Sequence, residues 1–244
     1  MIINPKKISV VIFDLWNTLF TIKSYSEQRI QKFFLFLQER KFFIPFDQFK
    51  NAFDDKFHFS AVTFEEIKFH HIYTEDRILS VLEELNIKIP QSDVDLLTRE
   101  FEPMMLQNPP PLKKGVKKTL EDLSPDYQIG LISNTGVIPG KVISKVLDEY
   151  GILQFFDATI YSDETGLFKP HPKMFEIPLT KFNCSPLNAI HVGDILETDI
   201  KGAKDYKMHS IWVNDRDYPK STEILPDFEI KQISEVIQII RDFS

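Results

Sequence analysis

The sequence predicts an α/β fold with a doubly wound, Rossmann-like parallel sheet and an all-helical domain inserted after the first strand. Three observations predict this fold. An unbroken apolar run occupies residues 10–13, four further apolar runs alternate with helical patterns after residue 110, and only helical patterns appear between residues 24 and 107. Strands that alternate with helices are typical of a parallel sheet covered on both faces. We therefore expect an α/β core at residues 1–20 and 110–244 and a helical domain at residues 21–109.

The first strand is the run Val-Val-Ile-Phe at residues 10–13, which is too short for an independent helix. Continuous apolar runs of this length fit a strand that is buried on both faces of a parallel sheet. The run ends at Asp14. In open α/β sheets, ligands bind at the carboxyl ends of the strands, so Asp14 is a candidate for chemistry.

The insert contains four apolar stripes at helical spacing, each of which predicts an amphipathic helix. It is also rich in phenylalanine, which indicates either an aromatic substrate pocket or core packing, and the helical spacing favours core packing. Three consecutive prolines end the insert, because proline cannot continue a helix. The stripes are Ile30, Phe33, Phe34 and Leu37; Phe46, Phe49, Phe53 and Phe57; Ile78, Val81, Leu82 and Leu85; and Val94, Leu97, Phe101 and Met104.

Strands and helices then alternate along the remaining chain. Strands are expected at residues 129–132, 158–161, 189–192 and 211–213. Helical stripes are expected around residues 116–123, 142–147, 174–182 and 233–240. Gly151 is expected to end the second of these helices at the C′ position, and Pro178 is expected to kink the third.

Composition narrows the function classes. The chain of 244 residues carries a net charge of −7 and has no basic block, which argues against nucleic-acid binding and against an anionic membrane surface. The single cysteine, Cys184, excludes an intramolecular disulfide and favours a reducing compartment. The N-terminus does not resemble a signal peptide, and no apolar stretch approaches the roughly 20 residues of a membrane span. We expect a cytoplasmic protein with a small-molecule substrate, as a monomer or a homodimer.

Polar residues of distinct kinds follow the predicted strands. Asp14 follows the first strand, Ser133 and Asn134 follow the strand at 129–132, Lys169 lies in a proline-flanked loop, and Asp194 and Asp199 follow the strand at 189–192. These positions converge at one edge of a doubly wound sheet. Carboxylate oxygens are the ligands that Mg²⁺ prefers. The Ser133 hydroxyl and nearby backbone N–H groups can donate hydrogen bonds to a phosphate group. An aspartate beside a cation can attack phosphorus as a nucleophile. Taken singly, each residue is better explained as a helix cap or a solvated loop residue, and only the combination at these strand ends favours a functional site.

At these residues the chain resembles the haloacid dehalogenase superfamily of aspartate-nucleophile hydrolases over essentially its whole length. The family's first motif, an apolar strand followed by D-x-D-x-T, here reads V-V-I-F-D-L-W-N-T-L. The second reads G-L-I-S-N-T, the third L-F-K-P-H-P, and the fourth, G-D-x-x-x-x-D, is G-D-I-L-E-T-D. Four motifs in the family's order make the resemblance specific. The insert looks like the type-one helical cap of the family.

The resemblance implies a Mg²⁺-dependent phosphatase. Asp14 would attack the phosphate monoester and form an aspartyl-phosphate, which water would hydrolyse. The metal ligands would be Asp14, Asp194, Asp199 and the backbone carbonyl of Trp16. Lys169 would be a catalytic residue that binds the phosphoryl group during its transfer. The implied phosphate-binding residues are Asn17, Thr18, Ser133, Asn134 and Lys169.

Trp16 departs from the family pattern. The phosphatases carry a second Asp at this position, which protonates the leaving oxygen and later activates water, and indole can do neither. The family's 2-haloacid dehalogenases carry an aromatic residue there and need no metal, but they lack the acidic fourth motif that this chain retains. The sequence therefore leaves three hypotheses, in this order: a phosphatase that is slow on alkyl phosphates, a member that binds a ligand with little or no catalysis, and a 2-haloacid dehalogenase.

Overall fold

The computed structural model describes residues 8–57 and 68–243 and contains a six-stranded, fully parallel sheet. The strand order is β3-β2-β1-β4-β5-β6. The chain therefore places β2 and then β3 on one side of β1, and afterwards places β4, β5 and β6 on its other side. This reversal between β2 and β4 creates a crevice at the carboxyl ends of the central strands. The strands are β1 Val10–Phe13, β2 Gln128–Ser133, β3 Ala158–Tyr161, β4 Ala189–Gly193, β5 His209–Val213 and β6 Phe228–Ile230.

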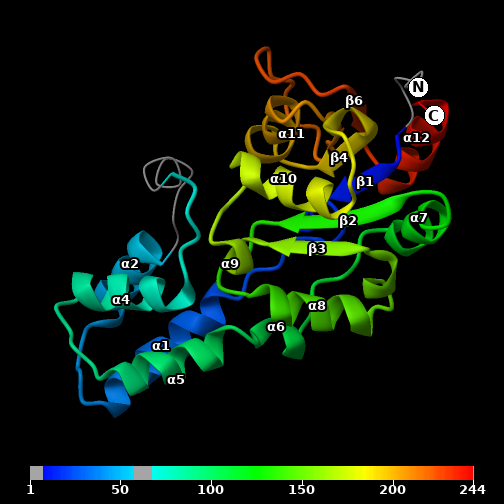
Figure 1. The fold of residues 1–244 in the computed structure, drawn as a ribbon. Helices are drawn as coiled ribbons and strands as arrows, with labels where there is room; N and C mark the ends of the chain where they lie inside the picture. The colour runs from blue at the N-terminus through cyan, green and yellow to red at the C-terminus, as the bar shows by residue number, and fades with distance from the viewer. Residues whose placement is uncertain (1–7, 58–67, 244) are drawn as a thin grey trace.

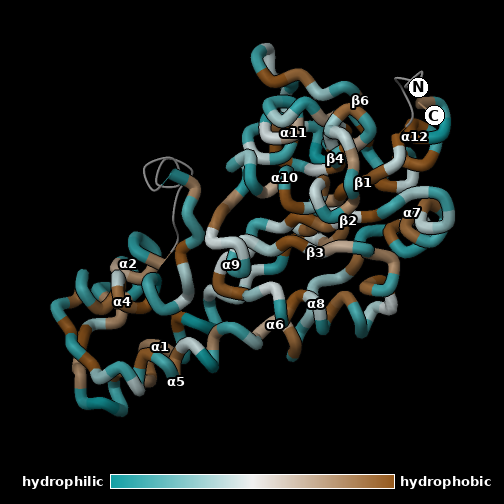
Figure 2. The backbone as a smooth tube through the Cα atoms, in the orientation of Figure 1, coloured by the Kyte–Doolittle hydropathy of each residue, from teal (hydrophilic) through white to brown (hydrophobic). Residues whose placement is uncertain are grey.

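Helices cover both faces of this sheet, which confirms the predicted α/β class (Figure 1). Side chains alternate along β1, so that Val11 and Phe13 join one apolar cluster and Val10 and Ile12 join the other. Figure 2 shows how hydrophobic residues concentrate along the central strands. The first cluster includes residues of α7 Val116–Leu123, α8 Gly140–Glu149 and α12 Val236–Phe243, and the second includes residues of α10 Pro172–Lys181 and α11 Lys201–Asp205.

Within the described residues, the segment between β1 and α7 forms helices α1 Ser26–Glu39, α2 Phe46–Lys56, α4 Thr74–Glu84, α5 Gln91–Phe101 and α6 Met104–Gln107. Helices α1 and α5 run antiparallel, because Lys32 contacts Glu100 and Arg40 contacts Asp93. Figure 1 shows these helices to one side of the sheet.

Phenylalanines of the predicted stripes form much of the core of the described part of the insert, in agreement with the core-packing interpretation. Phe33, Phe49, Phe53 and Phe57 are fully buried, and the rings of Phe53 and Phe57 stack with centroids 4.2 Å apart. Phe46 is the exception in the predicted stripe, since it is 43% exposed at the first position of α2.

The two linkers of the insert lie side by side. Thr21 N donates to the Pro111 carbonyl over 3.0 Å, and Lys113 N donates to the Leu19 carbonyl over 2.8 Å. The chain therefore leaves and re-enters the sheet region at one place. The predicted division at residues 20 and 110 stays a prediction, and the signal-peptide expectation rests on N-terminal residues outside the described part of the chain.

The glycine that was predicted to end α8 lies at its carboxyl end. Gly151 has φ +64°, and a Schellman pattern ends α8, with Gly151 N donating to Asp148 O and Ile152 N donating to Leu147 O. Pro178 lies inside α10 without ending it. The three-residue strand β6 was not expected, because a run this short is recognisable only from its pairing with β5.

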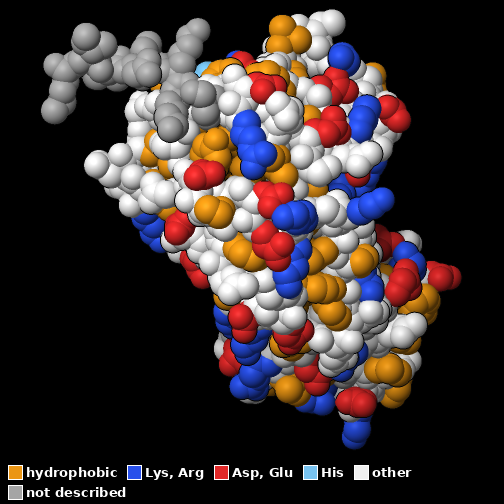
Figure 3. Space-filling view, turned by 90° about the vertical axis from the view of Figure 1, so that its right-hand side faces the viewer, with side chains coloured by type: hydrophobic (Ala, Val, Ile, Leu, Met, Phe, Trp, Pro, Cys, Tyr) orange, Lys and Arg blue, Asp and Glu red, His pale blue; other side chains and the backbone are white. Residues whose placement is uncertain are grey.

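Within residues 8–57 and 68–243, no helix combines the length and hydropathy needed to cross a bilayer. Figure 3 shows acidic and basic side chains interspersed on one face of the molecule.

Candidate active site

Three carboxylates and one lysine meet at the carboxyl ends of the central strands. Asp14, Asp194 and Asp199 each offer an oxygen atom, and these atoms lie within 4.8 Å of one another. Lys169 Nζ lies 2.6 Å from Asp14 Oδ1 and 2.6 Å from Asp199 Oδ1. Asp14, Lys169 and Asp199 are at most 5% exposed. The fold thus brings together four of the residues that the sequence singled out.

Lys169 is held at its backbone as well as at its ammonium group. Asn134 Oδ1 accepts from Lys169 N over 2.7 Å, and Asn134 Nδ2 donates to the Lys169 carbonyl over 3.1 Å. The ammonium group also donates to the Ile132 carbonyl over 3.2 Å. Asn134 was predicted to bind phosphate, and its side chain lies instead against the lysine loop. Asn134 therefore links the end of β2 to the segment that carries Lys169.

Asp199 is held on both of its oxygen atoms. His191 Nε2 lies 2.9 Å from Asp199 Oδ1, and Ile195 N donates to Asp199 Oδ2 over 3.1 Å. A Cβ atom at Gly193 would lie 2.4 Å from Asp199 Cγ, so the glycine of the fourth motif permits this close approach. Sequence analysis missed His191. The available signal is its position two residues before Gly193, which places both on one face of β4.

Burial and neighbouring charges together shift the pKa values of the three carboxylates and the lysine. Burial raises the pKa of Asp14 to about 6, against the opposing effect of Lys169. Burial, together with the negative charges of Asp14 and Asp199, raises the pKa of Asp194 to about 8. Burial opposes ionisation of Asp199 and Lys169 too, yet the charge of Lys169 lowers the pKa of Asp199, and the charges of Asp14 and Asp199 raise the pKa of Lys169. The cluster therefore contains more negative charge than one ammonium group balances.

Two buried hydroxyl groups at or after the carboxyl ends of β1 and β2 have no hydrogen-bond partner among the described residues. Ser133 Oγ at the end of β2 and Thr18 Oγ1 after β1 are fully buried and unpartnered. Buried hydroxyls are ordinarily hydrogen-bonded, since an unpaired one carries a desolvation penalty. Both residues were predicted to bind phosphate, and their free donors are available for an oxyanion.

Asn17 and Trp16 occupy the loop after β1. Asn17 has φ +57°, a left-handed conformation that asparagine tolerates, and its Oδ1 accepts from Arg216 Nη2. A hydrogen bond from Asn17 lowers the pKa of Asp194. Trp16 is partly buried and packs toward Phe20, with ring centroids 6.3 Å apart. Arg216, on the loop after β5, carried no motif that sequence analysis could use.

The helical insert contacts the lysine loop directly. Phe168 N donates to the Phe69 carbonyl over 2.6 Å, and His71 N donates to the Gly166 carbonyl over 2.8 Å. His71 Nδ1 lies 3.1 Å from Ser162 Oγ, and burial lowers the pKa of His71 to about 4. His171, two residues after Lys169, caps α10 by accepting a hydrogen bond from Lys173 N.

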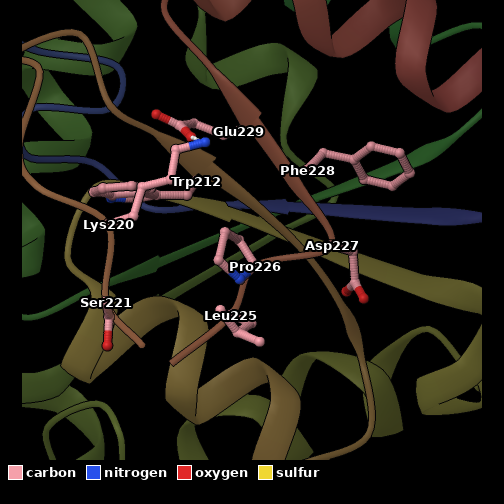
Figure 4. Close-up of a pocket in the computed structure, with 8 residues that line it drawn as sticks. All are labelled: Trp212, Lys220, Ser221, Leu225, Pro226, Asp227, Phe228 and Glu229. Carbon is pink, nitrogen blue, oxygen red and sulfur yellow. Dashed lines mark ion pairs between the residues drawn. The ribbon is translucent and has the colours of Figure 1, made fainter. Parts of the chain in front are cut away.

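A separate cavity of about 260 Å³ lies beside β5 and β6 and contains none of the predicted site residues (Figure 4). Trp212 lines it, and Trp212 Nε1 donates to the Asp194 carbonyl over 2.9 Å. The indole thus stands between this cavity and the backbone of the carboxylate cluster.

Relatives with assigned activities include phosphatases. The chain is 36% identical over 126 residues to a glyceraldehyde 3-phosphate phosphatase from Pyrococcus furiosus, which covers 50% of this chain and 48% of that protein. It is 31% identical over 86 residues to a phosphoserine phosphatase from Thermus thermophilus, covering 35% of this chain and 34% of that protein. The chain spans about half or less of the length of these curated relatives.

Solved structures share the fold over nearly the whole chain. A 2-haloacid dehalogenase from Pseudomonas syringae has a TM-score of 0.75 at 21% identity and covers 97% of this chain and 100% of its own. The magnesium-bound HAD-hydrolase YfnB from Bacillus subtilis has a TM-score of 0.66 at 21% identity and covers 96% of this chain and 99% of its own. A sequence model of haloacid dehalogenase-like hydrolases matches residues 8–206. The chain therefore belongs to the haloacid dehalogenase-like hydrolase family.

Proposed function

We propose that the protein hydrolyses a small phosphate monoester, with Asp14 as the nucleophile. The observation that carries this proposal is the buried cluster in which Lys169 bridges Asp14 and Asp199 beside the unpartnered hydroxyl of Ser133. A carboxylate held next to an ammonium group and a free hydroxyl donor suits attack on a phosphoryl group. The phosphatase relatives support the same assignment.

The reaction would proceed in two displacements. An Asp14 oxygen attacks phosphorus, the bond from phosphorus to the ester oxygen breaks, and the leaving oxygen takes a proton from solvent. Water then attacks the aspartyl-phosphate, which restores Asp14 and releases inorganic phosphate. Lys169, Ser133 and Thr18 would neutralise or donate to the phosphoryl oxygens, whose charge they face in both steps.

The donor set fits Mg²⁺. Asp14 and Asp194 offer carboxylate oxygens, and the repulsion that raises the pKa of Asp194 is the kind that a divalent cation would relieve. We assign Asp14, Asp194 and the Trp16 carbonyl as its ligands. Asp199, whose oxygens already accept three hydrogen bonds, would orient Lys169 beside this site. Bound Mg²⁺ would supply positive charge to the transferring phosphoryl group.

We further propose that residues 21–109 act as a cap that selects the substrate, and that Trp16 makes the enzyme depend on good leaving groups. Position 16 carries no group that can protonate an alkoxide at neutral pH. Acyl and aryl phosphates need little protonation, so they are the preferred class.

The test is a steady-state assay with p-nitrophenyl phosphate, acetyl phosphate and 2-chloropropionate, each with Mg²⁺ or with EDTA. We expect phosphate release that requires Mg²⁺ and disappears in Asp14→Asn. Asp205→Asn is the matched control, because Asp205 is exposed on α11 and, within the described residues, forms an ion pair only with Lys201. It should retain the activity of the unmodified protein.

Two outcomes contradict the proposal. Halide release from 2-chloropropionate that EDTA leaves unchanged would identify a dehalogenase. Mg²⁺ binding without turnover of any of the three substrates would identify a ligand-binding member of the family.

A further inference from the structure

Arg216 lies next to the carboxylate cluster and is held there by neutral side chains. It is exposed on the loop that follows β5, and β5 is the parallel neighbour of β4, so this loop starts beside the loop that carries Asp194. Arg216 Nη2 donates to Asn17 Oδ1, and Nη1 donates to the Tyr218 hydroxyl over 3.2 Å. Within residues 8–57 and 68–243, no carboxylate forms an ion pair with Arg216.

The two aspartates that flank Arg216 pair with other residues. Asp215 Oδ2 lies 2.6 Å from Nζ of Lys113, which belongs to the linker by which the chain returns from the insert. Asp217 pairs with Lys231, which follows β6. These contacts anchor the loop on both sides of Arg216. The guanidinium group is therefore not drawn to either adjacent acid and stays directed at the loop after β1.

Asn17 connects Arg216 to the carboxylate cluster. Asn17 is 7% exposed, and its side chain also hydrogen-bonds to Asp194. A side-chain amide has one accepting atom, Oδ1, and one donating group at Nδ2. A guanidinium group can only donate and an ionised carboxylate can only accept, so Oδ1 faces Arg216 and Nδ2 faces Asp194. The reversed amide would place oxygen against the carboxylate and N–H groups against the guanidinium, which is unfavourable at both ends.

Arg216 can influence a cation at Asp194 in two opposite ways. Its positive charge repels a divalent cation, which weakens binding. Its hydrogen bond fixes the Asn17 amide, which keeps a donor on Asp194 and strengthens binding. Water screens the charge of an exposed guanidinium, whereas Asn17 is buried and its contacts are screened much less. The effect through Asn17 is therefore the larger one.

We propose that Arg216 is a positioning residue of the metal site, which holds the Asn17 amide in the orientation that donates to Asp194 and thereby raises the affinity for a divalent cation. The proposal rests on the magnesium site assigned above. Groups that hydrogen-bond to a metal ligand orient it, and their removal typically costs 10–100-fold in metal affinity. Arg216 acts one residue further away, so the lower end of this range is expected.

Titration calorimetry of the full chain with Mg²⁺ alone tests the proposal. We expect Arg216→Met to weaken Mg²⁺ binding about tenfold. Arg216→Lys keeps a cationic donor and should recover part of this loss. Arg241→Met is the matched control, because Arg241 is an exposed arginine on α12, and it should bind Mg²⁺ as the unmodified protein does. Unchanged or tighter Mg²⁺ binding by Arg216→Met would overturn the proposal, since repulsion by the guanidinium would then be its only effect.

A double-mutant cycle shows whether Arg216 acts through Asn17. Asn17→Gly removes the amide, and glycine tolerates the positive φ of this position. In the Asn17→Gly background, Arg216→Met should cause little further loss of Mg²⁺ affinity, because the connection to Asp194 is already broken. An equal loss from Arg216→Met in both backgrounds would contradict a role through Asn17.

Two parallel measurements separate this proposal from the ones on which it rests. If Asp194→Asn abolishes Mg²⁺ binding while Arg216→Met binds normally, the metal site stands and the positioning role is wrong. If Asp194→Asn binds Mg²⁺ normally, both are wrong. Thermal unfolding in EDTA monitors folding without metal, and the exposed position of Arg216 predicts similar Tm values for all Arg216 variants. A fall in Tm in EDTA for Arg216→Met with unchanged Mg²⁺ affinity would assign Arg216 a structural role only.

Discussion

At the residue scale, the site contains charged residues and residues that position them. Asp14, Asp194 and Lys169 carry the charges that face the crevice, whereas Asn134 and His191 hold them in place. The Asn134 side-chain amide hydrogen-bonds to both the backbone N–H and the backbone carbonyl of Lys169. These contacts position the lysine without using the N–H donors of its ammonium group. Such supporting contacts are what keep a reactive group in one geometry.

Trp16→Asp tests whether proton transfer limits the enzyme. We expect a rise in kcat/KM for glycerol 3-phosphate of up to roughly 10²-fold, because general acid–base catalysis contributes about 10²–10⁴ in rate. The value for p-nitrophenyl phosphate should change much less, since its leaving group needs little protonation. Trp16→Phe, which adds no acid, is the control. An equal gain on both substrates would show that ring size, not proton transfer, limits turnover.

At the scale of elements, the segment before α4 contacts the loop that carries Lys169. The segment pairs with the loop through Phe69 and Phe168 and through His71 and Gly166. His71 also packs its ring against Phe168, with centroids 5.0 Å apart. The insert thereby touches the residue next to Lys169, so a change at this contact reaches the carboxylate cluster.

His71 predicts a pH dependence of stability. Burial lowers its pKa from 6.5 to about 4 in the folded protein, so the unfolded chain binds more protons between these values. Stability is therefore complete above about pH 6.5 and falls as the pH drops toward 4, by at most about 3 kcal/mol. Urea unfolding of the protein and of His71→Gln, at pH 7 and at pH 4.5, measures this difference. If both proteins lose equal stability on acidification, His71 is not the group responsible.

At the scale of the whole molecule, the reversal of strand order around β1 and β4 decides where the chemistry lies. An acidic residue directly follows each of these strands, and the parallel register aligns Phe13 with Val192, directly before Asp14 and Gly193. The helical insert leaves the sheet from the same end of β1. One edge of the sheet thus receives the carboxylates, the lysine loop and the linkers of the insert together.

Metal binding should stabilise the whole chain. A ligand that binds only the folded state stabilises it by about 2.7 kcal/mol at one hundred times its Kd, which corresponds to roughly 5–10 °C in Tm for a chain of this size. We expect Mg²⁺ to raise Tm relative to EDTA, and Asp194→Asn to lose most of this increase. Asp205→Asn should keep it. An identical response of Asp194→Asn and the unmodified protein would remove Asp194 from the metal site.

The sequence by itself determined the α/β class and the placement of the site residues. The apolar run before Asp14 and the runs before Ser133 and Gly193 predict buried strands, and parallel strands bring their carboxyl ends to one edge. Helical spacing likewise predicted the buried faces of α1, α4 and α5. In α2 it wrongly placed Phe46 on the buried face. These features follow from local periodicity and chain order, which a single sequence contains.

Only the tertiary structure decided how the site residues are held. The contacts of Asn134 with Lys169 and of His191 with Asp199 join residues 35 and 8 positions apart, and they depend on packing that no local pattern records. The strand β6 exists through its pairing with β5, and Arg29 reads in the sequence as one more polar residue on α1. The burial of Arg29 follows from how α1 packs in the insert, because burial is a property of the assembled helices.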